Sequence, residues 1–197
     1  MNAEGTVYTP ELCKELRKSL SFKSDNFLFS TPIGLKDVNS GIGEQIIDKV
    51  LKKVGVEIEF YEKDMWDKVA REGRFAPFIK AIRKWNIVVI SNKALRELYF
   101  LNYDHFIEIG YPNCHRDIDR VIKECINYGK PGVYLFAMGL PCTIAIQRLH
   151  NVIPNTFLLD LGSVWDTFVG AGKQRGWRQE LYANPKAYRE WLTKNLI

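Results

Sequence analysis

The sequence predicts an α/β fold, in which helices flank a doubly wound, mostly parallel sheet. Short apolar runs rich in β-branched and aromatic residues recur along the chain, and each has the length of a buried strand. Segments whose apolar residues repeat with helical spacing lie between these runs. Because parallel neighbours need a crossover connection, this alternation of strand and helix favours a parallel sheet covered by helices.

Each expected element follows from its own pattern. The expected strands are residues 26–30, 87–91, 105–109, 133–137 and 156–161. Helices are expected at residues 42–54, at residues 117–128, after Pro141, and near the C-terminus, where residues 179–197 form a packing segment.

Length and composition restrict the class of protein. The 197 residues suffice for one α/β domain, so 1–197 is expected to be a single domain. A net charge of +5 is too mild for a dedicated nucleic-acid-binding protein and is compatible with an anionic ligand. The four cysteines lack CxxC spacing, and neither a signal peptide nor a membrane-length apolar run occurs, so we expect free thiols and a cytoplasmic protein.

The residues that follow each expected strand are the candidates for ligand binding, because ligands of such sheets bind outside the carboxyl ends of the strands. Thr31 and Asn92 follow the first two strands. Asn92 is a candidate contact to a nucleobase or ribose, although asparagine is also a common turn and cap residue.

The strand at residues 133–137 leads through Gly139 and Pro141 into a helix that contains Thr143. Free N–H groups at a helix start, a glycine that permits close approach and a threonine hydroxyl suit a phosphate or diphosphate. The alternative is a plain turn between strand and helix, in which Gly139 only supplies a backbone angle.

A second candidate follows the strand at residues 156–161, where Gly162 and Ser163 precede Asp166. A carboxylate there can bind a divalent metal, accept a proton or bond a sugar. The alternative for Asp166 is a charge that complements a helix dipole. Asp160 lies inside the apolar run, and we expect it to be a sheet-interior carboxylate satisfied by a backbone or arginine partner.

Arg175 and Arg178 lie in a glycine-containing basic segment and could close over a diphosphate. The alternative is a solvated surface loop. The histidines show no zinc spacing, and the chain has no GxGxxG, no P-loop and no GxSxG motif.

The order of these pieces resembles the GT-D type of glycosyltransferase domain, a Rossmann-like Asp-x-Glu family. The resemblance rests on Asn2-Ala3-Glu4, a strand ending in STP, IVVISN, VYLFAMGLPCTIAIQRL and LLDLGSVWDTFVG, and it covers the chain from Asn2 to Arg178. Asn2 stands where the family has aspartate, and Ser163 stands where it has histidine. Because Met1 directly precedes the acidic element, we expect the first strand of the fold to be missing.

The resemblance implies transfer of a sugar from a nucleoside diphosphate sugar to a hydroxyl of a glycan or glycoprotein acceptor. It implies a divalent metal ion, manganese or magnesium, near Glu4, Asn2 and Asp166, with Asp166 or Glu4 as the base. Gly139, Thr143, Gly162, Ser163 and Arg175 would contact the substrate, and Thr31 and Asn92 the nucleoside.

Two other functions stay open: a non-catalytic nucleotide or sugar-nucleotide binding module, and an interaction protein on the same fold. A homo-oligomer also stays open.

Overall fold

The computed structural model describes residues 7–30, 49, 51–53, 55, 57–58, 60–61, 65–172 and 176–197. The chain divides into two compact units. The smaller unit is Tyr8–Met65, and the larger unit comprises Trp66–Ile197 together with Val7. Each unit is described by itself.

The smaller unit contains a helix and a pair of short strands. The helix α1 (Pro10–Leu20) begins at Thr9, whose hydroxyl accepts a hydrogen bond from the Leu12 N–H at 3.2 Å. Strand β1 (Phe29–Ser30) pairs in parallel with β2 (Phe60–Tyr61). The strand expected at residues 26–30 is therefore shorter than predicted, and it belongs to this pair and not to the larger sheet. Most of the helix expected at residues 42–54 lies outside the described residues.

The described part of the larger unit is built on a four-stranded, all-parallel sheet with the order β4-β3-β5-β6. The strands are β3 (Ile87–Ser91), β4 (His105–Glu108), β5 (Gly132–Ala137) and β6 (Thr156–Asp160). Their bounds lie within one residue of the predicted ones. The two central strands read as unbroken apolar runs because both of their faces are covered.

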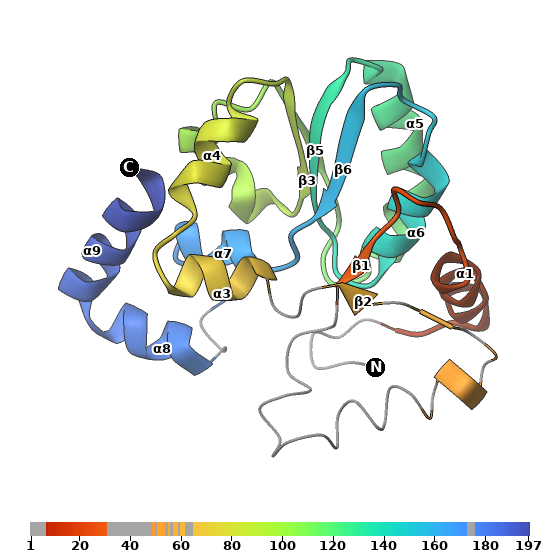
Figure 1. The fold of residues 1–197 in the computed structure, drawn as a ribbon, viewed down its shortest axis with the longest axis horizontal. Helices are drawn as coiled ribbons and strands as arrows, with labels where there is room; N and C mark the ends of the chain where they lie inside the picture. Colours follow the sequence, from red (N-terminus) through yellow and green to blue (C-terminus); the bar gives the residue numbers. More distant parts are fainter. Residues whose placement is uncertain are drawn as a thin grey trace. The chain divides into compact units, whose positions relative to one another are not determined.

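Helices cover both faces of this sheet, which confirms the predicted α/β class (Figure 1). One face carries α5 (Ile118–Tyr128) and α6 (Pro141–Leu149), while α3 (Met65–Arg71), α4 (Ala76–Ile82) and α7 (Val164–Phe168) lie on the other. The helices α8 (Gly176–Ala183) and α9 (Pro185–Leu196) pack outside this second layer. Short 3-10 turns complete the connections: η1 (Lys93–Glu97), η2 (Tyr99–Leu101) and η3 (Cys114–Asp117).

A hydrophobic core lies between the sheet and the helices on the α7 face. Strand residues Ile87 and Val89 point into it and are fully buried, as expected for alternate positions of one strand. The rings of Phe75, Trp165 and Phe168 pack there with centroids 5.4 to 5.6 Å apart. Aromatic packing of this kind contributes about 0.5–1.5 kcal/mol per pair beyond area burial, so this cluster firmly anchors α7 under the sheet.

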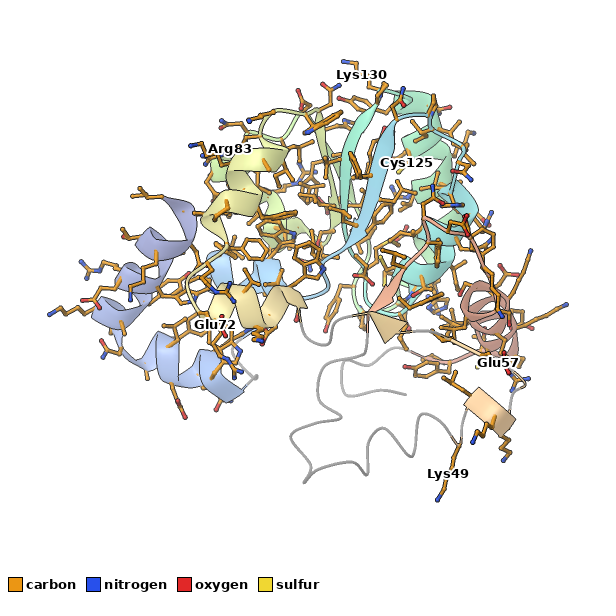
Figure 2. The ribbon with its side chains drawn as sticks, in the orientation of Figure 1. Lys49, Glu57, Glu72, Arg83, Cys125 and Lys130 are labelled. Atoms are coloured by element: carbon orange, nitrogen blue, oxygen red, sulfur yellow. The ribbon has the colours of Figure 1, made fainter. Side chains whose placement is uncertain are left out.

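The strand order places a topological switch point between β3 and β5, because the chain leaves β3 toward β4 and later returns to the opposite side. Lys130, which precedes β5, marks the amino edge of the sheet in Figure 2. The carboxyl edge at the other end is where this class of sheet binds ligands. Within the described ranges, no helix is long and apolar enough to cross a membrane.

Candidate functional site at the carboxyl edge of the sheet

The described site candidates gather at one edge of the sheet. Asn92 follows β3, Gly139 and Thr143 follow β5, and Gly162 with Asp166 follows β6. Ser163 lies next to Gly162 at the start of α7. The other predicted site residues, Asn2, Glu4, Thr31 and Arg175, lie outside the described residues.

The ends of β3 and β5 are joined at the switch point. The Ser91 hydroxyl donates to the Ala137 carbonyl at 3.3 Å. The next residue, Asn92, caps η1, because its Oδ1 accepts the Ala94 N–H at 2.9 Å. The cap role considered for Asn92 is therefore present, and its contact to a nucleoside remains a prediction.

The turn from β5 into α6 differs in detail from the predicted phosphate cradle. Gly139 and Leu140 are exposed, and α6 begins at Pro141 as expected. The Cys142 N–H, however, donates to the Gly139 carbonyl at 2.9 Å, and the Thr143 N–H donates to the Leu140 carbonyl at 3.3 Å. Because these two N–H groups already have acceptors, any ligand contact here would come mainly from the exposed Gly139-Leu140 backbone and the Thr143 hydroxyl.

Asp160 is the carboxylate that the sequence reading placed wrongly. It is the last residue of β6 and retains solvent contact, so it lies at the carboxyl edge and not inside the sheet. Its Oδ1 accepts the Gly162 N–H at 2.9 Å, which is the expected kind of backbone partner. Desolvation of its carboxyl raises the pKa of Asp160 above its ordinary value, and hydrogen bonds from Gly162 and the Cys142 thiol offset this only in part.

Two buried thiols lie beneath this edge. Cys142 is fully buried and shares a hydrogen bond with Asp160, while the Cys114 thiol donates to the Met138 carbonyl at 2.7 Å. Burial raises the pKa of the Cys142 thiol well above its usual range, and the nearby Asp160 carboxylate adds to the shift. A thiol that stays protonated is a poor nucleophile, so Cys142 supports its neighbours structurally. None of the four cysteines, all within the described ranges, forms a disulfide, in agreement with the prediction of thiols.

Arg178 is buried and not part of a solvated loop. Its side chain is 1% exposed, and its Nη2 lies 3.2 Å from Asp67 Oδ1. Nη1 and Nη2 both donate to the Ser163 hydroxyl at 3.4 Å. The neighbouring Trp177 ring donates from Nε1 to the second Asp67 oxygen at 3.1 Å. A cation from α8 is thus held between α3 and the turn after β6.

Asp166 lies in the first turn of α7, where a carboxylate complements the helix dipole. Its backbone is well tied: its N–H donates to the Ser163 carbonyl at 3.1 Å, and its carbonyl accepts the Ala171 N–H at 2.8 Å. Its side chain packs against Gly172. The dipole reading is therefore compatible with the structure, and the role of Asp166 in binding or catalysis remains a prediction.

The predicted metal set is described only in part, since Asn2 and Glu4 lie outside the described residues. In the remaining, described parts of the chain, no group of three or more His, Cys, Asp or Glu side chains is placed to hold a metal ion. Asp160 and Asp166 are the oxygen donors that β6 and α7 bring to this edge. These two carboxylates alone do not make up a ligand set for a metal ion.

Comparison with known proteins supports the fold. No protein-family model and no curated protein sequence matches the chain. Two solved structures of domain of unknown function 1792, one described as having a distinct glycosyltransferase fold, are similar with a TM-score of 0.59 and 16% identity, covering 90% of this chain and 68% of theirs. A new glycosyltransferase of the same domain type from Streptococcus sanguinis gives a TM-score of 0.63 at 14% identity, covering 90% of this chain and 70% of that one.

Identities this low establish likeness of fold alone. The resemblance to a GT-D type domain expected from the sequence is confirmed at that level. The chain has a glycosyltransferase-like fold.

Proposed function

We propose that the protein transfers a sugar from a nucleoside diphosphate sugar to a hydroxyl of a glycan or glycoprotein acceptor. The observation that carries the proposal is a pair of carboxylates at the carboxyl edge of a glycosyltransferase-like fold: Asp160, the last residue of β6, and Asp166, in the first turn of α7. A cytoplasmic location is part of the proposal, and free thiols support it.

The donor would lie across the switch point. Its diphosphate would contact the turn at Gly139, the Thr143 hydroxyl and Arg175, and its nucleoside would lie near Thr31 and Asn92. A sugar at this place would reach the end of β6, where Gly162 and Ser163 separate the two carboxylates.

The reaction needs a group that accepts the proton of the acceptor hydroxyl as the sugar bond to the diphosphate breaks. Asp166 or Glu4 would serve as this base. Asp160 is a further candidate, because a carboxyl whose pKa is raised is a better proton acceptor near neutral pH than an ordinary aspartate. A divalent ion held by Glu4, Asn2 and Asp166 would stabilise the departing diphosphate.

Binding is tested first, by thermal shift with UDP, GDP and their sugars, with and without manganese. A shift that depends on manganese supports the transferase. A shift without manganese favours a non-catalytic binding module, for which the neutral Asn2 in place of an aspartate is the favouring observation. No shift with any nucleotide contradicts both.

Chemistry is tested by donor hydrolysis and sugar transfer in Asp166→Asn, Asp160→Asn and Glu4→Gln. Loss of a catalytic acid or base typically costs roughly 10²- to 10⁴-fold in rate. Glu190→Gln is the matched control, since it makes the same chemical change at an exposed position of α9 and should retain the wild-type rate. Wild-type rates in all three of these variants would refute the assignment of the site.

A further inference from the structure

We propose that Arg178 is a positioning residue that holds the segment from Gly162 to Gly172 in place, and with it Ser163 and Asp166. The proposal rests on the proposed function only for its activity readout. It gives α8 a direct part in shaping the carboxyl edge, although α8 lies outside the sheet and outside the helix layer that covers it.

The first observation is that Arg178 connects three separate parts of the chain. It pairs with Asp67 of α3 at 3.2 Å and donates to the Ser163 hydroxyl at the start of α7 at 3.4 Å. It also lies against Gly172, at the other end of the segment: a Cβ built on that glycine would lie 3.2 Å from Arg178 Nη1. One guanidinium therefore donates to one end of the segment and lies beside the other.

The second observation is that the side chains of Asp166 and Arg178 both lie close to Gly172. The same Cβ position lies 3.1 Å from Asp166 Cβ and 3.2 Å from Asp166 Oδ2. The residue has a φ of +67°, which glycine adopts readily and other residues rarely do. The carboxylate of Asp166 and the cation of Arg178 thus share the space that a side chain at residue 172 would fill.

The third observation is that neighbouring residues hold the same segment through uncharged groups. The Tyr182 hydroxyl of α8 donates to the Ala171 carbonyl at 2.8 Å, and the Tyr188 hydroxyl of α9 donates to the Thr167 carbonyl at 2.9 Å. The segment is therefore fixed at several points along its length. Arg178 differs from the tyrosines because it brings a charge and reaches Ser163.

The energetics argue that this cation is not there for stability. A buried ion pair is weak support for a fold, and its replacement by apolar residues of similar volume is often neutral or stabilising. Arg178 Nε is buried without a hydrogen-bond partner among the described residues, which adds a further cost. A costly charge beside Ser163 and Asp166 is better explained by the placement of those two residues.

The test replaces the pair together, as Asp67→Asn with Arg178→Met, so that no unpaired charge stays buried and the Trp177 indole keeps an acceptor at residue 67. We expect a Tm equal to or above that of the wild type. Hydrogen exchange of the Asp166 and Ala171 amides, which are bonded inside the segment, should accelerate by roughly tenfold or more. Donor hydrolysis should lose roughly 10- to 100-fold in kcat with little change in KM for the donor, as misplacement of a reacting group does.

Two further variants complete the test. Arg178→Lys keeps the charge and should recover part of the lost kcat. Arg189→Met makes the apolar replacement at an exposed position of α9 and should leave both readouts unchanged. If the double variant keeps wild-type exchange at both amides, the proposal is wrong whatever the activity. If exchange accelerates while kcat stays at the wild-type value, it is wrong as well. If the wild type transfers and hydrolyses no donor, the proposed function fails and hydrogen exchange alone decides the positioning role.

Discussion

Asn195, near the end of α9, should be among the most sensitive polar positions of the larger unit. The residue is fully buried, and its amide joins three backbone groups. Its Oδ1 accepts the Phe75 N–H at 3.1 Å, and its Nδ2 donates to the carbonyls of Ala70 at 3.1 Å and Trp191 at 2.9 Å. The C-terminal helix is thereby bonded to the connection between α3 and α4.

The cost of Asn195→Ala can be worked from these partners. Ala70 keeps an acceptor role, because its carbonyl also receives the Trp191 indole N–H at 2.7 Å. The Phe75 N–H belongs to a fully buried residue and loses its acceptor, which costs about 1–3 kcal/mol. Loss of the packing of the deleted amide adds about 1 kcal/mol. We therefore expect a loss of about 2–4 kcal/mol in the free energy of unfolding.

Urea unfolding followed by tryptophan fluorescence measures this loss specifically. All five tryptophans lie within Trp66–Ile197, so the signal reports the larger unit. With an m-value of about 2 kcal/mol/M, the midpoint should fall by about 1–2 M. Thr193→Ala, at an exposed position on the same helix, should change stability by no more than about 0.5 kcal/mol. A loss below about 1 kcal/mol in Asn195→Ala would refute the reasoning from the unpaired N–H.

Three other predictions follow from single groups. Folding raises the pKa of Asp160 above its ordinary 3.8, so protonation of this carboxyl stabilises the folded protein, and that stabilisation is lost as pH rises through the raised pKa. Asp160→Asn should therefore have a higher Tm than the wild type at neutral pH. The difference in Tm should vanish below pH 3.8, where the wild-type carboxyl is protonated in both states. Asn184 caps α9 by accepting two backbone N–H groups, so Asn184→Ala should cost about 1 kcal/mol in urea unfolding while Asn184→Asp retains the cap. Burial raises the pKa of Cys125 to about 12 and that of Cys142 well above its usual range, so peptide mass spectrometry after maleimide treatment of the native protein should find the partly exposed Cys13 modified about tenfold faster or more.

The sequence predicted the larger sheet well because its signal is local. The strand at residues 87–91 is apolar throughout and buried on both faces, so its composition alone identifies it. Residues 26–30 have a similar composition, but strand pairing is a long-range property. The partner of β1 is Phe60–Tyr61, about thirty residues away, and the local pattern does not reveal it.

The strand ends where the candidate residues lie could be predicted, but the surroundings of Arg178 and Asp160 could not. The strand ends could be located because parallel topology places them at one edge. Arg178 could not be recognised as buried, because its partner Asp67 lies 111 residues earlier in the chain and the local sequence shows only cations among glycines. Asp160 was assigned to the sheet interior because the apolar run continues through Leu161, whereas β6 ends at Asp160.

Asp160 and Arg178 share one property: each carries a charge that its surroundings disfavour. Asp160 is a carboxylate whose charge its surroundings oppose, and Arg178 is a buried cation with a nitrogen left unpaired. Asp160 ends β6, and the guanidinium of Arg178 in α8 donates to Ser163 in the turn that follows, while Trp165 and Phe168 supply apolar burial on the face below. A neighbouring core can offset the cost of a locally unfavourable charge. Such charges are expected at positions where function, and not stability, determines which residue is present. Neutral replacement of Asp160, and of Arg178 together with its partner Asp67, should therefore give a protein that melts higher and reacts more slowly, whereas structural charges would give the opposite change in melting temperature.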